Sequence, residues 1–151
     1  MLRIGVIGTG SISENNLTPA IAEVEGAELW SILSRDKGRA EAFAREQGAK
    51  SPEPGFSSLD QFLSDPKLDA VIIASPDGLH AEQTIAAAQA GKHVLVEKPM
   101  ATNMKGLNEL MQIAKKTKKY IFAAPFVVLS PVFQAMHQEI INKSIGKISL
   151  A

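Results

Sequence analysis

The stretch that decides the fold is LRIGVIGTGSIS, residues 2–13, at the start of the chain. A short apolar run leads directly into Gly8 and Gly10, two glycines one residue apart. An apolar run that glycine closes is typical of a strand buried on both faces, as in a parallel sheet. We therefore expect a strand, a glycine turn and then a helix over residues 12–24.

The turn has the pattern G-x-G-x-x-S, because Ser13 stands where a third glycine or alanine is usual. In dinucleotide-binding turns the first glycine permits the bend, the second lets the backbone approach a pyrophosphate, and the third position must be small. Amides at the helix start bind the phosphates, helped by the helix dipole. The residues that we expect to bind the cofactor here are Gly8, Thr9, Gly10, Ser11 and Ile12. The alternative is a glycine turn with no ligand.

Strand-like apolar runs alternate with helical patterns over the first 124 residues. This alternation predicts an α/β fold, a doubly wound parallel sheet of the Rossmann type. Strands are expected at 2–7, 27–34, 50–51, 68–75, 92–98 and 120–125. Residues 1–124 are expected to form a dinucleotide-binding domain. Residues 125–151 are expected to be a linker helix and the first strand, KISLA, of a truncated second α/β domain.

The composition excludes several classes of function. Among 151 residues, 16 basic side chains balance 16 acidic ones, so nothing favours nucleic acid or an anionic membrane as partner. The chain has no cysteine, which excludes disulfides and thiolate metal sites, and we expect no metal. No apolar run approaches the length of about 18 residues that a membrane span needs, and no signal peptide is visible. We expect a cytoplasmic protein.

The residues after the second expected strand bear on the choice of cofactor. An acidic residue there would bind the ribose 2′-hydroxyl of NAD. Ser34 and Arg35 stand there instead, and a hydroxyl with a guanidinium suits a 2′-phosphate. Arg39 adds positive charge, whereas Asp36 is expected to cap the next helix. The sequence favours NADP over NAD, and the alternative is that both arginines form a solvated helix face.

A second signal is the end of the strand HVLV, which leads into Glu97, Lys98 and Pro99. The proline fixes the path of the chain as it leaves the sheet, so the lysine lies at the same edge as the glycine turn. A lysine beside a nicotinamide could donate a proton to a carbonyl group or hold an alcohol oxygen during hydride transfer. From the residues alone, a solvated surface lysine is the commoner interpretation.

Three blocks together, GVIGTGSIS, SPDGLHAEQTIAAAQAGKHVLV and EKP, resemble the Gfo/Idh/MocA oxidoreductase family over roughly residues 2–124. The resemblance implies an N-terminal NAD(P)-binding Rossmann domain and a C-terminal α/β domain with an open, mostly antiparallel sheet. It implies hydride transfer between a nicotinamide cofactor and a sugar, inositol or related polyol or carbonyl substrate. It also makes Lys98 the catalytic candidate, with Glu97 on the nicotinamide side.

The same resemblance places Ser75 and Pro76 in a loop that passes over the cofactor. Asp77 stands where the family often has asparagine, and we expect it to cap the following helix over residues 78–90. His80 matches a histidine of the family at the start of that helix. The resemblance implies a place near the cofactor for it, and the alternative is a buried histidine that neighbouring backbone satisfies.

Two functions remain open from the sequence. One is the cofactor-binding domain of an oxidoreductase, and the other is a stand-alone dinucleotide-binding or regulatory module without turnover. We expect the isolated chain to bind nucleotide with little turnover, because a substrate must be held in near-attack geometry by a second domain. Exposed apolar side chains after the last strand also lead us to expect a homo-oligomer, and the alternative is that roughly the last 25 residues are loosely held. They are Phe126, Val127, Val128, Leu129, Val132 and Phe133.

Overall fold

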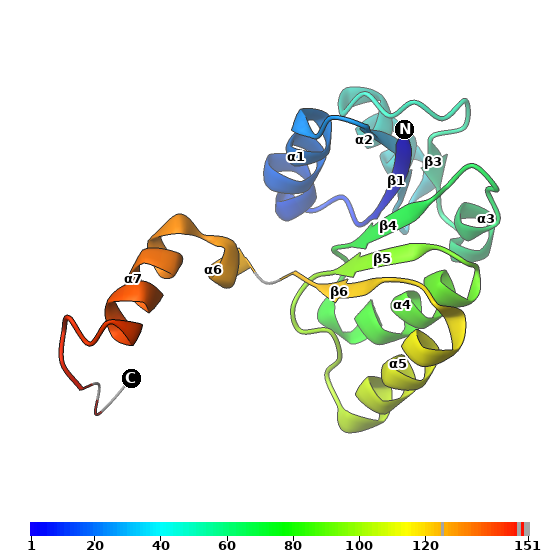
Figure 1. Ribbon diagram of the computed structural model, residues 1–151. Helices are drawn as coiled ribbons and strands as arrows, with labels where there is room; N and C mark the ends of the chain where they lie inside the picture. Colours follow the sequence, from blue (N-terminus) through cyan, green and yellow to red (C-terminus); the bar gives the residue numbers. More distant parts are fainter. Residues whose placement is uncertain (125, 148, 150–151) are drawn as a thin grey trace.

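The computed structural model describes residues 1–124, 126–147 and 149, without the side chain of Phe126. Its sheet has six strands in the order β3-β2-β1-β4-β5-β6, all paired in parallel. The strands are β1 (Leu2–Ile7), β2 (Ala27–Leu33), β3 (Gly55–Phe56), β4 (Ala70–Ile73), β5 (His93–Val96) and β6 (Ile121–Ala123). Helices lie on both faces (Figure 1). The predicted doubly wound parallel sheet is therefore confirmed.

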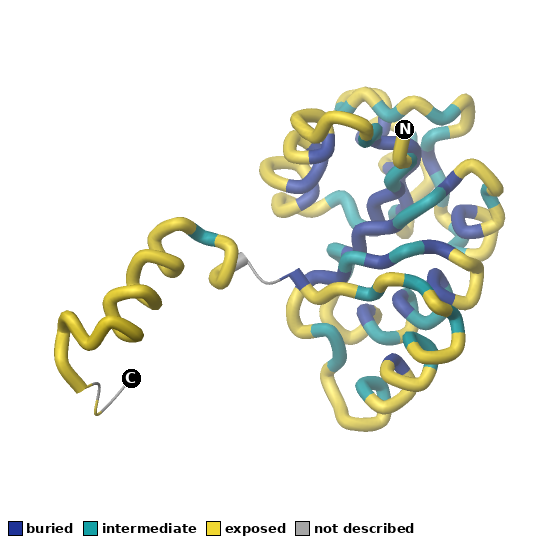
Figure 2. Tube along the Cα trace, in the orientation of Figure 1, coloured by how far each residue is buried: buried dark blue, intermediate teal, exposed yellow. Residues whose placement is uncertain are grey.

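The helices follow the strands in alternation, as a series of βαβ units requires. They are α1 (Thr18–Glu23), α2 (Lys37–Glu46), α3 (Leu59–Leu63), α4 (His80–Gln89), α5 (Met104–Thr117), α6 (Phe126–Leu129) and α7 (Pro131–Ile141). A π-helical segment, η1 (Ser13–Leu17), precedes α1, and a 3₁₀ turn, η2 (Asp77–Leu79), precedes α4. In Figure 1, α6 and α7 extend away from the sheet. Figure 2 shows that α7 is exposed along its length.

Two apolar cores lie on opposite faces of the sheet, because successive side chains of a strand point to opposite sides. Val6 of β1 belongs to the core beneath α1 and α2, where it joins Phe43. Its neighbour Ile7 belongs to the core beneath α3 and α4, where it joins Phe62. Both β1 residues are almost completely buried, at 0% and 2% exposure. This burial on both faces explains why the first strand has no polar alternation near its end.

The third strand is not where the sequence placed it. Lys50 and Ser51 each donate a backbone hydrogen bond to β2, but the strand itself is Gly55–Phe56. The expected strand at 50–51 is therefore wrong, because two residues are too few to show a strand period and the local turn residues hid the pairing. The expected cap at Asp77 is also wrong: this residue lies within η2, and α4 starts without a side-chain cap. The strand expected at 147–151 lies largely outside the described residues.

The helix after the glycine turn explains the serine in the third small position. Ser13 is fully buried, and its hydroxyl has no hydrogen-bond partner among the described residues. Its carbonyl oxygen instead accepts from the backbone N–H of Thr18 and, at 2.9 Å, from the hydroxyl of the same residue. The position therefore requires a small side chain, and the serine hydroxyl makes no hydrogen bond among the described residues.

At the opposite, amino-terminal edge of the sheet, Lys92 joins two loops. Its side chain is buried, and Nζ donates to the carbonyl oxygens of Asp65 and Leu68 at 2.7 and 2.8 Å. Desolvation lowers the pKa of Lys92 below its usual 10.5, and the carboxylates of Asp65 and Asp69 oppose part of that change. The indole N–H of Trp30 donates to the Asp65 carboxylate at 2.6 Å, which holds the same loop.

We predict that Ser13→Ala raises the free energy of unfolding by about 1 kcal/mol, because it removes a buried hydroxyl without a partner. Ser13→Val should lower it by about 1–3 kcal/mol, because the added methyl groups overfill a closed site. Urea unfolding followed by circular dichroism measures both changes. A clear loss of stability in Ser13→Ala would contradict the packing interpretation.

A second prediction concerns pH. The folded pKa of Lys92 is the lower one, so the unfolded chain binds more protons and the stability contributed by this residue rises with pH up to 10.5. We expect the free energy of unfolding of the wild type, minus that of Lys92→Met, to increase between about pH 8 and about pH 10. Urea titrations of both proteins at each pH measure it. A difference that does not change with pH would show that Lys92 titrates normally.

Candidate functional site

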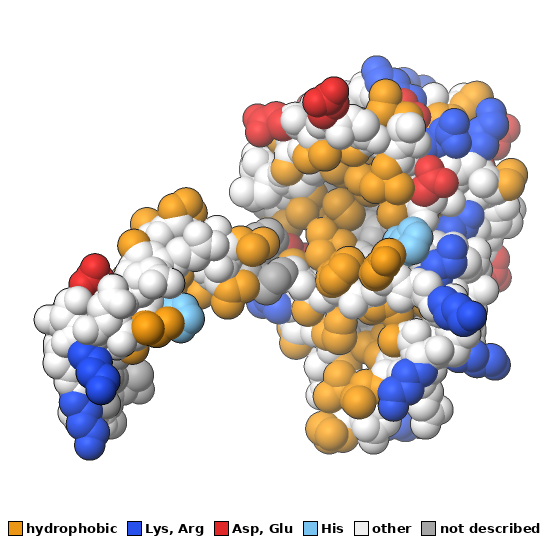
Figure 3. Space-filling view, in the orientation of Figure 1, with side chains coloured by type: hydrophobic (Ala, Val, Ile, Leu, Met, Phe, Trp, Pro, Cys, Tyr) orange, Lys and Arg blue, Asp and Glu red, His pale blue; other side chains and the backbone are white. Residues whose placement is uncertain are grey.

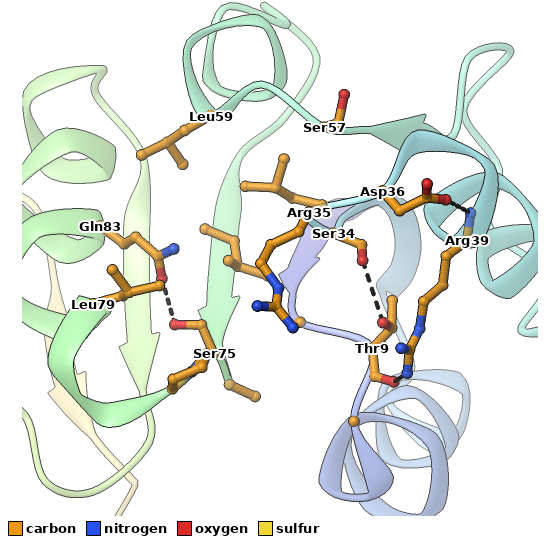
Figure 4. Close-up of a pocket in the computed structure, with 16 residues that line it drawn as sticks. Thr9, Ser34, Arg35, Asp36, Arg39, Ser57, Leu59, Ser75, Leu79 and Gln83 are labelled. Atoms are coloured by element: carbon orange, nitrogen blue, oxygen red, sulfur yellow. Dashed lines mark hydrogen bonds between the residues drawn. The ribbon is translucent and has the colours of Figure 1, made fainter.

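An open pocket of about 720 Å³ lies at the carboxyl edge of the sheet, where β1, β2 and β4 end. In doubly wound sheets ligands bind at this edge, where the strand order reverses. The pocket is lined by Ile7, Gly8, Thr9, Gly10, Leu33, Ser34, Arg35, Asp36, Arg39, Ser57, Leu59, Ala74, Ser75, Pro76, Leu79 and Gln83. Figure 4 shows the glycine turn and the β2 end on one side, with the loop after β4 opposite.

The floor of the pocket is the glycine turn. Gly8 has a φ of +113°, and a Cβ there would lie 2.5 Å from the carbonyl oxygen of Ala74, so only glycine fits. Its N–H donates to the carbonyl oxygen of Leu33 at 2.9 Å. A Cβ at Gly10 would meet nothing within 4 Å, so the backbone there is open to the pocket. The helix begins directly after it, and its first N–H groups have no acceptor within the helix.

The wall formed by the end of β2 carries the positive charge. The hydroxyl of Ser34 lies 3.5 Å from that of Thr9, and Arg39 Nη2 donates to the Thr9 carbonyl oxygen at 3.0 Å. The carboxylate of Asp36 accepts the backbone N–H of Arg39 at 2.7 Å, so the predicted helix cap is confirmed. In Figure 4 the side chain of Arg35 extends into the space between the two walls. This wall therefore presents two guanidinium groups and a hydroxyl.

The opposite wall follows β4. The hydroxyl of Ser75 donates to Gln83 Oε1 at 2.5 Å, and Pro76 continues the lining. Leu79 and Gln83 line the pocket from η2 and α4. We did not predict either residue from the sequence. Their spacing of four residues places both on one face of the helix that follows the expected loop at Ser75 and Pro76. Ser57 and Leu59 were also missed, because they reach the pocket from the short β3–α3 segment, which has no periodic signal.

Five of the thirteen predicted site residues do not line this pocket. They are Ser11, Ile12, His80, Glu97 and Lys98. The first two lie exposed at the helix start, and the other three surround the end of β5. The pocket brings together the remaining eight predicted residues, from Gly8 to Pro76. Contact of all thirteen with a cofactor stays a prediction.

The Glu-Lys-Pro segment leaves β5 at the same edge of the sheet as the pocket. Lys98 is exposed, and the peptide that joins it to Pro99 is cis. Glu97 is 5% exposed, and one carboxylate oxygen accepts the backbone N–H of Lys98 at 3.3 Å. His80, 1% exposed, has Nδ1 2.8 Å from the Pro99 carbonyl oxygen and Nε2 2.8 Å from that of Ser75. This geometry matches the alternative interpretation of His80, a histidine whose ring bonds the backbone.

Known proteins resemble the chain across nearly its whole length. A family model described as "Oxidoreductase family, NAD-binding Rossmann fold" matches residues 2–124. The scyllo-inositol 2-dehydrogenase (NADP(+)) IolU of Bacillus subtilis is 35% identical over 93% of this chain and 42% of its own length. The 1,5-anhydro-D-fructose reductase of Ensifer adhaerens is 32% identical over 97% of this chain and 43% of its own. The chain thus spans less than half the length of these relatives.

The chain also resembles a solved structure over nearly its whole length. KijD10, a 3-ketoreductase from Actinomadura kijaniata in complex with TDP-benzene and NADP, is 28% identical with a TM-score of 0.88. The match covers 97% of this chain and 45% of that one. No helix in the described residues is long and apolar enough to cross a membrane. The strand order, the glycine turn and the family match over residues 2–124 together show that the chain belongs to the Gfo/Idh/MocA oxidoreductases and carries their NAD-binding Rossmann domain.

Proposed function

We propose that the chain is the cofactor-binding part of an NADP-dependent oxidoreductase that acts on a sugar, inositol or related polyol or carbonyl compound. Residues 1–124 would form the dinucleotide-binding domain, and residues 125–151 would lead into a substrate-binding α/β domain. The observation that carries the proposal is the pocket, which brings the glycine turn together with Arg35, after β2, and Arg39, in the first turn of α2. The names of the two relatives, an inositol dehydrogenase and an anhydrofructose reductase, support the substrate class.

The residues present fit a dinucleotide. The open backbone at Gly10 and the N–H groups of the following helix suit a pyrophosphate. Two guanidinium groups, from Arg35 and Arg39, and the hydroxyl of Ser34 suit a 2′-phosphate on the adenosine ribose. Asp36 also lines the pocket, and its Oδ1 already accepts a backbone N–H of α2, so one carboxylate that caps a helix stands against two guanidinium groups. The balance of these groups favours NADP over NAD.

Lys98 would act on the substrate side of the cofactor. When bound, the nicotinamide supplies or accepts the hydride. The ammonium group of Lys98 is exposed at the carboxyl edge of β5, where it could donate a proton to a carbonyl oxygen or hold the oxygen of an alcohol. The N–H of the preceding Glu97 donates to the carbonyl oxygen of Ile73 in β4 at 2.9 Å, which keeps the main chain before the lysine at this edge.

A stand-alone dinucleotide-binding module is the second candidate. The observation that favours it is the position of Lys98, which lies outside the pocket that the described residues enclose. Binding of nucleotide alone does not separate the two candidates, because both need the pocket. Substitution of Lys98, with NADP-dependent turnover of an inositol or sugar as the readout, separates them.

We predict that the chain binds NADPH more tightly than NADH, and that Arg35→Ala weakens NADPH binding by about tenfold through loss of a charged hydrogen bond. NADH binding should change by less than about twofold, because it has no 2′-phosphate to lose. Calorimetric titration of both nucleotides measures this. Arg45→Ala is the matched control, since this arginine of α2 is exposed and its one ion-pair partner among the described residues is Glu41. Equal affinities for the two cofactors would contradict the NADP assignment, and no binding of either would contradict the proposed function.

We also propose that the isolated chain forms a homo-oligomer through the apolar side chains of α6 and α7. Val127, Val128, Leu129, Val132 and Phe133 are 46–68% exposed, whereas Phe126 has a side chain outside the described part. In Figure 3 apolar side chains lie on the surface of the segment formed by α6 and α7. Apolar exposure on this scale favours association, because it removes the surface from water.

The oligomer can be tested by sedimentation velocity across a range of protein concentrations. We expect the wild type to associate, and Leu129→Asp with Val132→Asp to shift it to monomer, since both charges would enter the interface. Gln134→Asp is the control, because it adds a charge to the same helix at a polar position. A wild type that stays monomeric at every concentration would overturn the proposal.

A further inference from the structure

His80 joins the loops that follow β4 and β5 at the carboxyl edge of the sheet. Its ring is 99% buried, and each nitrogen lies 2.8 Å from a carbonyl oxygen. One oxygen belongs to Ser75, in the loop after β4, and the other belongs to Pro99, in the loop after β5. A single side chain of α4 therefore spans the ends of two neighbouring strands.

We propose that His80 is a positioning residue for the nicotinamide half of the site, an inference that rests on the proposed function. Pro99 follows Lys98 directly, so the bond from His80 Nδ1 holds the main chain on the carboxyl side of the lysine. The N–H of Glu97 donates to the carbonyl oxygen of Ile73 in β4 at 2.9 Å and holds the main chain on its amino side. The lysine thus projects from a backbone that buried groups hold on both sides, while its own side chain stays exposed.

The second ring nitrogen, Nε2, brings this lysine segment against the pocket wall. Ser75 lines the pocket with its side chain toward Gln83, and its carbonyl oxygen meets His80 Nε2. Carbonyl oxygens only accept, so a neutral ring donates to one of them and a protonated ring to both. Because the ring is rigid and fully packed, it sets the separation of the two loops before a ligand arrives, which lowers the ordering cost of binding.

The role can be tested by comparing two nucleotides on the same variants. NADPH needs both halves of the site, whereas 2′,5′-ADP carries the adenosine and the 2′-phosphate but no nicotinamide. Calorimetric titrations would compare the wild type with His80→Ala, His80→Asn and His80→Gln. The amide of asparagine places its donor near the position of Nδ1, toward Pro99, and that of glutamine places it near Nε2, toward Ser75.

We expect His80→Ala to weaken NADPH binding by about tenfold and to leave 2′,5′-ADP binding within about twofold. His80→Asn should recover most of the lost NADPH affinity, and His80→Gln should recover less. The reason is that the bond to Pro99, which only the asparagine can replace, is the one that positions the lysine segment. Thr84→Val is the matched control, since Thr84 is a fully buried polar residue one turn along α4 whose hydroxyl bonds nothing in the described residues. It should bind both nucleotides as the wild type does.

The remaining outcomes overturn the inference. If His80→Ala binds both nucleotides as the wild type does, the ring positions nothing. If the Asn and Gln variants fold but lose both nucleotides equally, its role is general stability. If His80→Ala does not fold, the comparison of His80→Asn with His80→Gln decides. Equal NADPH affinities of these two variants would refute the bond to Pro99. A wild type that binds neither nucleotide refutes the proposed function instead, and this inference falls with it.

Discussion

The close approach of Gly8 to the end of β4 is the constraint on which the site depends. The Cα of this glycine faces the Ala74 carbonyl so closely that no side chain fits, and its N–H bonds the end of β2. One residue therefore brings three strand ends to a common point. A side chain there would push β4 from β1, and the pocket between their ends would lose its floor. The start of the helix directly after Gly10 owes its place to the same turn.

The strand order then distributes the chemistry. Because β1 lies between β2 and β4, the arginines after β2 and the serine loop after β4 face each other across the glycine turn (Figure 4). β5 lies one strand farther out, so Lys98 shares the edge but stands outside the pocket. His80 bridges this last step, from the end of β4 to the end of β5. The arginines after β2, the serine loop after β4 and Lys98 after β5 therefore lie in this order along the carboxyl edge of the sheet.

Elements with a clear period were predictable from the residues. β1, β2, β4 and β5 are apolar runs in which half or more of the positions are buried, and Asp36 caps α2 through a local hydrogen bond that depends on four residues. β3 was misplaced because a strand of two residues has no period, and its pairing with β2 is decided by distant backbone. Asp77 fails as a cap because a 3₁₀ turn precedes α4, which local propensity does not reveal.

The sequence by itself determined five of the six strands, the glycine turn and six of the eight predicted pocket residues, because each depends on a short local pattern or on a strand end, whereas Ser75 and Pro76 came from the family resemblance. Only the tertiary structure decided that Gln83 and Leu79 line the pocket and that Lys98 and Glu97 stand outside it. It alone showed that both nitrogens of His80 meet carbonyl oxygens on two different loops. Those contacts join residues 5 and 19 positions apart, and a linear pattern does not show which distant backbone group a buried ring will meet.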